Sequence, residues 1–468
     1  MKNTNSSISK LYGFIRAALS GKQKEFTTGS INRAILMLSI PMIAEMIMES
    51  LFAVVDVFFV SQVGVNAVAT VALTESVLMI IYSIAVGMSM AVTAIVARRV
   101  GEKDEHRATN AAFQGILVGS FFGLIFGLSG LIFAEDVLRL MGGDQDVIAE
   151  GVGYTRIMFG SNIVIILLFL INGIFRGAGD ASIAMRSLWL ANGINIILDP
   201  LLIFGIWIFP DLGVKGAAIA TTIGRSVGVA YQLFYLFNGR SVIRLTVKNI
   251  VLRVATIKEI IRISGGGMGQ FLVESASWIF LVRVMSLFGA EALAGYTIAF
   301  RVIIFTILPS WGMANAAATL VGQNLGAKAP ERAELSVWRT AHWNMIFLGS
   351  ISVLFYLAAE PILWIFSDET TVISTGVSAL KIICLGYVFF AYGMVISQAF
   401  NGAGDTRTPM FINIFVFWLL QIPLAYWLSV YLDWQARGVF ISIALCHSLH
   451  ALICIFLFKR GRWKLVSV

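Results

Sequence analysis

One hexapeptide occurs twice in the sequence, and the interval between its two copies constrains the whole fold. Phe175–Asp180 reads FRGAGD and Phe400–Asp405 reads FNGAGD, 225 residues later, with five of the six residues identical. Without a gap, the same offset aligns Ser39 with Ser264 and continues as far as Val439. A single register over most of the chain indicates an internal duplication, so the protein is expected to fold as two copies of one half.

The composition places both halves in a membrane. The sequence is 58% hydrophobic and only 13% charged, with a mean hydropathy of +0.86, whereas a soluble domain carries roughly 25% charged residues. Apolar runs such as 163–171 and 346–359 recur between short charged turns. Because about 20 mainly apolar residues cross a bilayer as a helix, we expect an all-α integral membrane protein with twelve transmembrane helices in two homologous six-helix lobes.

The expected spans divide evenly between the halves. Those of the first half are expected at 33–60, 68–97, 108–133, 147–176, 181–206 and 214–238. Those of the second half are expected at 264–288, 292–324, 335–358, 372–401, 406–431 and 437–459. The resulting domains are a tail over 1–32, an N-lobe over 33–240, a linker over 241–263, a C-lobe over 264–459 and a second tail over 460–468.

Charges in the loops predict the orientation. Lys and Arg gather in the N-terminal tail, after spans 2, 6 and 8 and after the last span, while the opposite loops carry acids such as Glu135, Asp136 and Glu360. Because Lys and Arg favour the cytoplasmic side, both termini are expected in the cytoplasm of a bacterial inner membrane. With an even number of spans per half, a pseudo-two-fold axis along the membrane normal relates the lobes, and a substrate path lies between them.

Two segments outside the spans have simple interpretations. The first long apolar stretch, which starts near Ile31, runs too far to be the core of a signal peptide. In the linker, Arg253, Lys258 and Arg262 alternate with Val and Ile. This pattern predicts a basic amphipathic helix on the cytoplasmic surface.

Several classes of function lack any supporting motif. The three cysteines lie in apolar segments, the four histidines show no metal-ligand spacing, and no nucleophile–base or nucleotide-binding motif is present. These features predict no enzyme, no metal, no cofactor and no ATP-driven pump. The net charge of +8 lies in alternate loops, where membrane orientation explains it, so nucleic acid is not an expected partner.

The repeated Gly-Ala-Gly-Asp turns are expected to be structural. They join spans 4 and 5 and spans 10 and 11, and no strand precedes them, so a nucleotide-binding loop is dismissed. Glycine past a helix end accepts the left-handed backbone, and aspartate can cap the following helix. The residues assigned to this role are Gly177, Gly179, Asp180, Gly402, Gly404 and Asp405.

Ionisable residues inside the spans are the main candidates for function. Such a side chain costs from about 2.5 to more than 10 kcal/mol in hydrocarbon, so it faces a cavity or a partner helix. Glu45, Glu49 and Asp56 on span 1 are four and seven residues apart and share one helical face. Glu45 and Glu49 are candidates for a substrate or second cation site.

A second polar set lies on spans 4 and 5. Asn195 and Asp199 are one turn apart, and the proline after Asp199 frees a backbone carbonyl. Counting 1.5 Å per residue puts Asp56, Asp199 and Tyr154 at a similar depth. Two carboxylates, an amide and a phenol at one depth predict a proton or sodium site, since two close carboxylates repel when both are ionised. The alternative is a structural polar network inside the N-terminal bundle.

The second half is not equivalent. The positions that match Asp56 and Asp199 are Leu281 and Leu424, so ion coupling is expected to be asymmetric. Glu274 on span 7 is the one deep acid of this half and matches Glu49. It is a candidate for binding a cation or the substrate. The basic residues inside the spans either pair with these acids or extend to the membrane interfaces. They are Arg156, Arg225, Arg283, Arg301 and Lys381.

These features together resemble the multidrug and toxic compound extrusion (MATE) family. The resemblance rests on twelve spans in two homologous halves, the two Gly-Ala-Gly-Asp turns, Val55-Asp56 late in span 1 and Asn195 with Asp199-Pro200 on span 5. It covers residues 33 to 459. It implies V-shaped lobes around a central cavity and export of cationic or amphipathic compounds against an inward proton or sodium gradient. A monomer is expected, because the duplication already supplies both halves.

The resemblance also implies roles for single residues. Asp56 carries the coupling ion, with Asn195, Asp199 and Tyr154 beside it and Asn172 as a further member, and Glu274 is similar to the span-7 acid of sodium-coupled members. The coupling ion stays open between H⁺ and Na⁺. Two other functions are less well supported by the sequence. A flippase for lipid-linked oligosaccharides shares the architecture but needs a cationic cavity for pyrophosphate, and an intramembrane enzyme lacks the motifs it requires.

Overall fold

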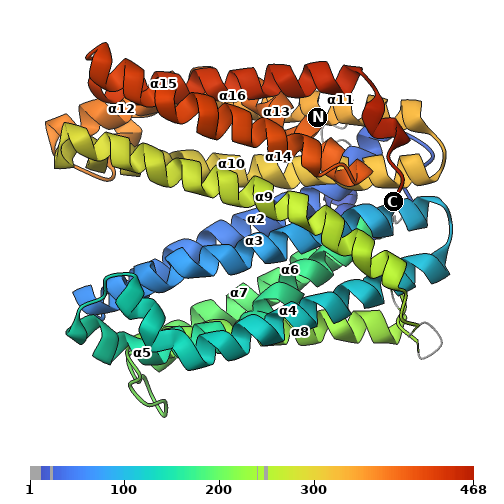
Figure 1. Cartoon of the computed structure of the whole chain (residues 1–468), viewed down its shortest axis with the longest axis horizontal. Helices are drawn as coiled ribbons and strands as arrows, with labels where there is room; N and C mark the ends of the chain where they lie inside the picture. Colours follow the sequence, from blue (N-terminus) through green and yellow to red (C-terminus); the bar gives the residue numbers. More distant parts are fainter. Residues whose placement is uncertain (1–11, 22–24, 240, 247–250) are drawn as a thin grey trace, which may run out of the picture.

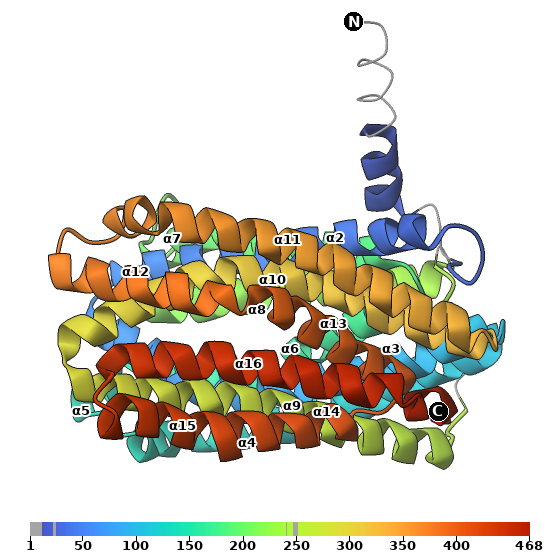
Figure 2. The ribbon, with the colours of Figure 1, turned by 90° about the horizontal axis from the view of Figure 1, so that it is seen from above.

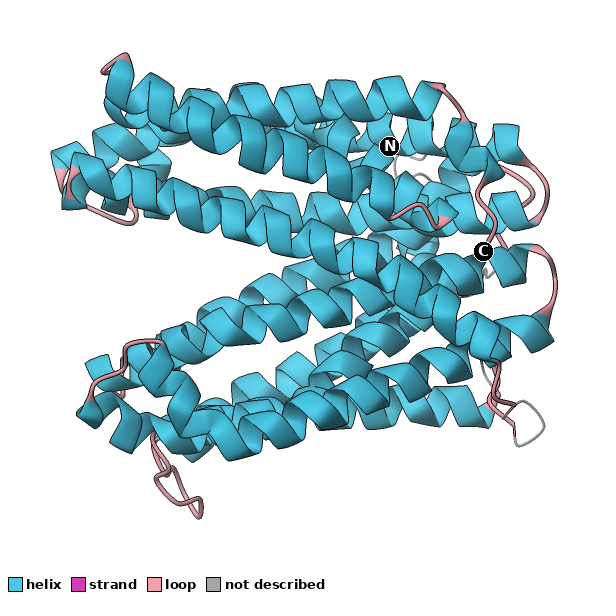
Figure 3. Ribbon diagram, viewed as in Figure 1, coloured by secondary structure: helices cyan, strands magenta, loops and turns pink. Residues whose placement is uncertain are grey.

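The computed structural model describes residues 12–21, 25–239, 241–246 and 251–468. In this part of the chain every regular element is a helix (Figure 3). The seven helices of the N-lobe are α2 (Ile31–Ser61), α3 (Val65–Gly101), α4 (Glu105–Leu140), α5 (Gln145–Gly160), α6 (Asn162–Gly177), α7 (Ala181–Ile203) and α8 (Val214–Asn238).

The C-lobe repeats this order. It contains α9 (Val254–Met285), α10 (Ala290–Gly326), α11 (Pro330–Trp364), α12 (Thr370–Leu385), α13 (Tyr387–Ala403), a composite span over 407–431 and α16 (Gln435–Lys459). The composite span consists of α14 (Arg407–Asn413), α15 (Ile422–Tyr426) and the wider π-helical turns Ile414–Gln421 and Trp427–Tyr431.

These helices confirm the all-helical, two-lobe fold with twelve spans. Among the described residues, eight helical segments are long and apolar enough to cross a membrane, three in the N-lobe and five in the C-lobe, where the composite span is one of them. Helices α2 and α8 also belong to the N-lobe. The fourth and tenth spans are each broken, by 42° between α5 and α6 and by 57° between α12 and α13. The breaks fall at Ser161 and Gly386, which the 225-residue offset aligns.

The two lobes form a V (Figure 1). They diverge toward the tips of α5 and α12, which we call the open end, and converge where the C-terminus and the ends of α3 and α10 lie, which we call the closed end. Seen from above, α9 and α16 run along the body of the molecule, and the short helix over residues 12–20 projects from one side (Figure 2). Each lobe has its own buried apolar core.

The lobes contact each other through equivalent glycines. A Cβ on Gly87 of α3 would lie 2.7 Å from the backbone nitrogen of Met268 in α9, and a Cβ on Gly312 of α10 would lie 2.7 Å from the carbonyl oxygen of Met42 in α2. Only glycine permits backbones this close. Since the offset aligns Gly87 with Gly312, each half packs its second helix on the first helix of the other half.

Polar contacts also join the two lobes at the closed end. Gln323 of α10 donates to the carbonyl of Gly177 (3.2 Å), so the C-lobe reaches the first Gly-Ala-Gly-Asp turn. Arg98 of α3 donates to the carbonyl of Val466 (2.6 Å). Arg332 of α11 donates to the carbonyl of Thr28 (2.9 Å), in the segment before α2. Both ends of the chain therefore bridge the two lobes.

The two Gly-Ala-Gly-Asp turns differ in how they use aspartate. Gly179 and Gly404 have φ of +84° and +88°, in the left-handed region. Asp405 accepts from the backbone nitrogen of Thr408 (3.2 Å) and so caps α14. Asp180 makes no such cap on α7 and instead accepts from Ser241 Oγ (2.5 Å). This contact ties the first turn to the linker, which has no counterpart in the second half.

The basic stretch of the linker is helical but is not a separate surface helix. It forms the first turns of α9, which continues into the seventh span. Ile260 and Ile263 are fully buried in the N-lobe core, whereas Ile261 is exposed. The apolar face of the stretch thus covers the N-lobe, because α9 crosses over to that lobe at the closed end. Residues 247–250, and residues 1–11 of the tail, lie outside the described chain.

Candidate functional site

A buried carboxylate–amide pair lies on α7. Asn195 Nδ2 donates to Asp199 Oδ1 (3.1 Å) and to Thr221 Oγ1 of α8 (3.0 Å). The helices approach closely there, since a Cβ on Gly224 would lie 2.4 Å from the carbonyl of Ala191. Asp199 Oδ2 and Asn195 Oδ1 have no hydrogen-bond partner among the described residues. Buried acceptors without a donor are rare, so the pair is suited to taking up a proton or a cation.

Asp56 and Glu75 bring two more acids to this region from α2 and α3. Asp56 interacts electrostatically with Asp199 and with Arg225 of α8. Glu75 interacts with Asp56 and with Arg225. Tyr154 of α5 is buried and interacts with both Asp56 and Glu75. Glu49 of α2 also interacts electrostatically with Glu75 and Arg225. This region of the N-lobe, which we call the acid cluster, therefore contains four carboxylates and one guanidinium.

Arg225 is held in place by aromatic side chains. Its Nη2 donates to the hydroxyl of Tyr82 (3.0 Å), and its guanidinium lies 5.7 Å from the ring centroids of both Tyr82 and Phe52. A guanidinium over an aromatic face is attracted by the ring electrons. These contacts fix the one positive charge of the cluster.

A second network surrounds Glu45. Glu45 Oε1 accepts hydrogen bonds from Arg176 Nη2 and from Asn172 Nδ2, the latter at 3.1 Å. Asn172 Oδ1 in turn accepts from Ser187 Oγ (3.1 Å) and Gln232 Nε2 (2.7 Å). The structure therefore places Asn172 with Glu45, and no hydrogen bond among the described residues joins it to Asp56 or Asp199. Glu49, one turn from Glu45 on α2, accepts from Asn192 Nδ2 (3.0 Å).

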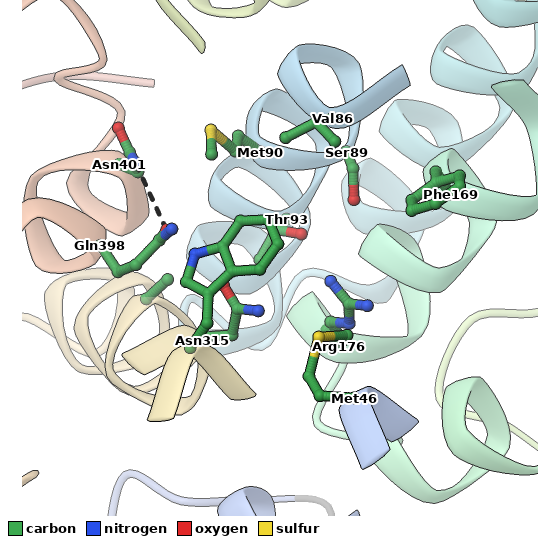
Figure 4. Close-up of a pocket in the computed structure, with 12 residues that line it drawn as sticks. Met46, Val86, Ser89, Met90, Thr93, Phe169, Arg176, Asn315, Gln398 and Asn401 are labelled. Atoms are coloured by element: carbon green, nitrogen blue, oxygen red, sulfur yellow. Dashed lines mark hydrogen bonds between the residues drawn. The ribbon is translucent and has the colours of Figure 1, made fainter. Parts of the chain in front are cut away.

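Two neighbouring cavities lie at the junction of the lobes and in the C-lobe. The smaller, of about 50 Å³, lies at the junction of the lobes (Figure 4) and is lined by Met46, Val86, Ser89, Met90, Thr93, Phe169, Arg176, Trp311, Asn315, Ala318, Gln398 and Asn401. The larger, of about 310 Å³, lies mainly in the C-lobe. Met90, Trp311 and Gln398 line both.

The larger cavity is aromatic with a single acid. Glu274 of α9 lines it, and among the described residues Glu274 forms no hydrogen bond or ion pair. Trp278, Phe390 and Phe417 surround His447, with the His447 ring centroid 4.4 Å from that of Phe390 and 4.8 Å from that of Phe417. An apolar pocket with a few polar groups is the usual form of a small-molecule site.

Comparison with known proteins identifies the family of the chain. The MatE family model matches residues 41–201 and again 267–427. The protein belongs to the MatE family. Both halves are matched, as the duplication requires. The chain is 26% identical to "Probable multidrug resistance protein NorM" of Thermotoga maritima, over 93% of each chain. It is 25% identical to "FAD transporter" of Shewanella oneidensis, over 92% of this chain and 95% of the relative.

Solved structures agree. A structure described as "Outward-facing conformation of a multidrug resistance MATE family transporter of the MOP superfamily" matches with a TM-score of 0.87 and 27% identity over 94% of this chain and 99% of that one. A MOP superfamily transporter from Pyrococcus furiosus, described as having reverse polarity of its binding pocket, matches with a TM-score of 0.86 and 28% identity over the same shares. The protein is therefore a membrane transporter of small molecules and not an enzyme.

The site of this MATE protein contains polar residues that the sequence predicted and one further acid. Asp56, Asn195, Asp199 and Tyr154 lie in one region of the N-lobe, as their depth predicted. Glu75 was not singled out, although an acid inside an apolar run was a visible signal. The structure also gives definite positions to two cations, Arg176 against Glu45 and Arg225 in the acid cluster. No group of three or more His, Cys, Asp or Glu side chains in the described ranges could hold a metal ion.

Proposed function

We propose that this protein is a secondary active exporter of amphipathic small molecules, driven by an inward gradient of H⁺ or Na⁺. The observation that carries the proposal is the pair of buried, unpartnered acceptor oxygens on Asp199 and Asn195 beside Asp56. A cation or proton balances that charge, and a site of this kind can couple ion entry to a conformational change. Relatives named multidrug resistance proteins support the direction of transport.

The orientation follows from the basic loops. Arg98, Arg99 and Lys103 lie at the closed end of the V, and Glu135 and Asp136 lie at the open end. Lys and Arg favour the cytoplasmic side. This charge distribution supports a cytoplasmic closed end, with the V open toward the outside. In this state the acid cluster can receive an ion from outside.

Ion uptake is coupled to substrate release through α2. Asp56 and Met46 lie on this one helix, Asp56 in the acid cluster and Met46 in the small cavity. Pro41 lies inside α2 and removes one backbone hydrogen bond, so it marks a place where the helix can bend. Charge neutralisation at Asp56 or Asp199 rearranges α2, Met46 leaves the cavity, and the substrate loses contacts. The lobes then rock inward, release the ion and reload.

The alternative is a flippase for a lipid-linked oligosaccharide. A specific observation favours it: Arg176 is the one charged side chain that lines the small cavity, and a pyrophosphate requires positive charge. The larger cavity argues against the flippase, because Glu274 is the one acidic side chain among the described residues that line it and no basic Lys or Arg side chain lines it. A pyrophosphate would be repelled there.

The test is export from proteoliposomes that contain a fluorescent organic cation, with either a proton or a sodium gradient imposed. We expect export with one gradient, at least tenfold slower for Asp56→Asn. Glu150→Gln is the matched control, because it makes the same acid-to-amide change at an exposed position on α5. Export by folded Asp56→Asn at the wild-type rate would remove Asp56 from the mechanism. Failure of both gradients, with flipping of a labelled lipid-linked sugar, would establish the alternative.

A further inference from the structure

The duplication relates two hydrogen-bonded pairs, each of which contributes one side chain to the small cavity. The 225-residue offset aligns Glu45 with Gln270 and Arg176 with Asn401. In the N-lobe, Arg176 donates to Glu45 Oε1. In the C-lobe, Gln270 Nε2 donates to Asn401 Oδ1 (2.9 Å) and Asn401 Nδ2 donates to Gln270 Oε1 (3.1 Å). The two lobes thus keep one geometry but differ in charge, with an ion pair on one side and a pair of neutral amides on the other.

Of this ion pair, only the basic residue Arg176 lines the small cavity. Glu45 lies behind Arg176, with 1% of its side chain exposed against 12% for Arg176. Figure 4 shows its guanidinium pointing into the space between Phe169, Thr93 and Met46. Among the described residues no hydrogen bond uses Nη1 of Arg176. A fixed guanidinium with a donor left over matches the geometry of a carboxylate or phosphate group.

The other polar side chains of the small cavity are suited to binding a ligand group that accepts hydrogen bonds. They are hydroxyls and amides, from Ser89, Thr93, Asn315, Gln398 and Asn401, and no carboxylate lines the cavity. These groups can all donate hydrogen bonds. A volume of about 50 Å³ holds a few water molecules. It is therefore large enough for one carboxylate and too small for an aromatic body.

The larger cavity has the opposite character. It shares part of its wall with the small one, through Met90, Trp311 and Gln398, and Glu274 is its one carboxylate. Trp278, Phe390 and Phe417 offer flat apolar faces. Aromatic faces and a carboxylate together attract an organic cation. The two neighbouring cavities therefore place a basic side chain on the N-lobe side and an acidic side chain on the C-lobe side.

We propose that the two cavities form one site for amphipathic zwitterions, in which Arg176 binds an anionic group and the aromatic cationic body lies in the C-lobe cavity beside Glu274. This proposal rests on the proposed export function and specifies its substrate class. Because the equivalent C-lobe pair is neutral, the substrate binds in one orientation only. It also spans both lobes, so separation of the lobes breaks one of its two anchors.

The test uses two probes that differ in one carboxylate, the zwitterion rhodamine B and its ethyl ester, which is only a cation. Fluorescence polarisation measures their binding to the purified full-length protein. We expect the wild type to bind the acid about tenfold more tightly than the ester, as one charged hydrogen bond predicts. The double substitution E45Q/R176N copies the C-lobe pair, and we expect it to abolish the preference while the affinity for the ester stays within about twofold.

The matched control is E135Q/R139Q, which removes an ion pair of the same type (2.9 Å) at an exposed position on α4. It should keep the tenfold preference. Should E45Q/R176N fail to fold, N315D provides a second variant, because it adds a negative charge to the small cavity without altering the ion pair; it should also lose the preference. Equal binding of both probes by the wild type, or a preference retained in E45Q/R176N or in folded N315D, would overturn the proposal.

An export assay with the ester distinguishes failure of the zwitterion site from failure of the exporter function. Gradient-driven export of the ester from proteoliposomes, without any preference for the acid in binding, would leave the exporter in place and reject the zwitterion site. No export of either probe under either gradient would reject the exporter itself.

Discussion

Gly101 and Gly326 occupy equivalent positions in the two halves, and each lies against the backbone of the other's helix. A Cβ on Gly101 at the end of α3 would lie 2.0 Å from the carbonyl oxygen of Gln323 in α10, and a Cβ on Gly326 at the end of α10 would lie 2.1 Å from the carbonyl oxygen of Arg98 in α3. At the closed end, the ends of α3 and α10 thus contact each other through two glycines related by the duplication. No real Cβ fits at these distances, and backbone on both sides cannot move aside as a flexible side chain would.

We therefore expect G101A and G326A to separate the helix ends that close the V. Overpacking of this kind typically costs about 1 to 3 kcal/mol, and we expect a lower melting temperature in detergent by several degrees. The control is G193A on α7, where an added Cβ meets nothing within 4 Å and alanine stabilises a helix by up to about 1 kcal/mol. An unchanged melting temperature in both G101A and G326A would show that the close approach is not needed.

The ion pair between Glu45 and Arg176 predicts a strongly non-additive pair of substitutions. E45Q leaves a guanidinium without its partner, and R176N leaves a carboxylate that is 1% exposed. Breaking one side of a buried pair costs about 3 to 5 kcal/mol. The double variant restores a neutral hydrogen-bonded pair like Gln270–Asn401 and should lose much less. A double-mutant cycle on thermal or denaturant unfolding measures the coupling; additive losses would contradict it.

The sequence predicted most of the fold because the duplication and the hydropathy act over long stretches. All twelve spans are helical, and residues such as Asp56 and Asp199 lie in one region because helical rise converts sequence position into depth. What could not be predicted is rotation about each helix axis and the path of α9. Asn172 therefore lies with Glu45, and the basic stretch of the linker covers the N-lobe core. Gly-Ala-Gly-Asp predicted a turn twice, but not that Asp180 would bind Ser241 while Asp405 caps α14.

Glu75 provides a test of the acid cluster that the sequence did not suggest. It interacts electrostatically with both Arg225 and Asp56. Without its charge, more of the positive field of Arg225 acts on Asp56, so a bound cation or proton is less favoured. We expect E75Q to need about tenfold more of the coupling ion for half-maximal export, with the maximal rate retained. Titration of export against ion concentration in proteoliposomes measures this, and an unchanged half-maximal concentration would remove Glu75 from the site.

We expect the C-terminal segment, residues 462–468, to act as a latch that holds the lobes together at the closed end. Trp463 is fully buried and stacks on Phe458 of α16 at 4.6 Å between ring centroids, which anchors the segment to the C-lobe. Beyond this anchor, Arg98 and Arg99 of α3 donate to the main-chain oxygens of Val466 (2.6 Å) and Val468 (2.5 Å). The segment therefore joins the C-lobe to the N-lobe helix that carries Gly101.

We expect W463A to release this latch, because loss of a buried tryptophan costs about 3 to 5 kcal/mol and the bonds to Arg98 and Arg99 depend on the position of the segment. Hydrogen exchange followed by mass spectrometry should show faster exchange at the ends of α3 and α10. L465A is the control, since this side chain is 85% exposed. If exchange at the segment itself accelerates in W463A but the ends of α3 and α10 stay protected, the glycine contact alone closes the V. If both accelerate together, the latch and the glycine contact hold the closed end as one unit.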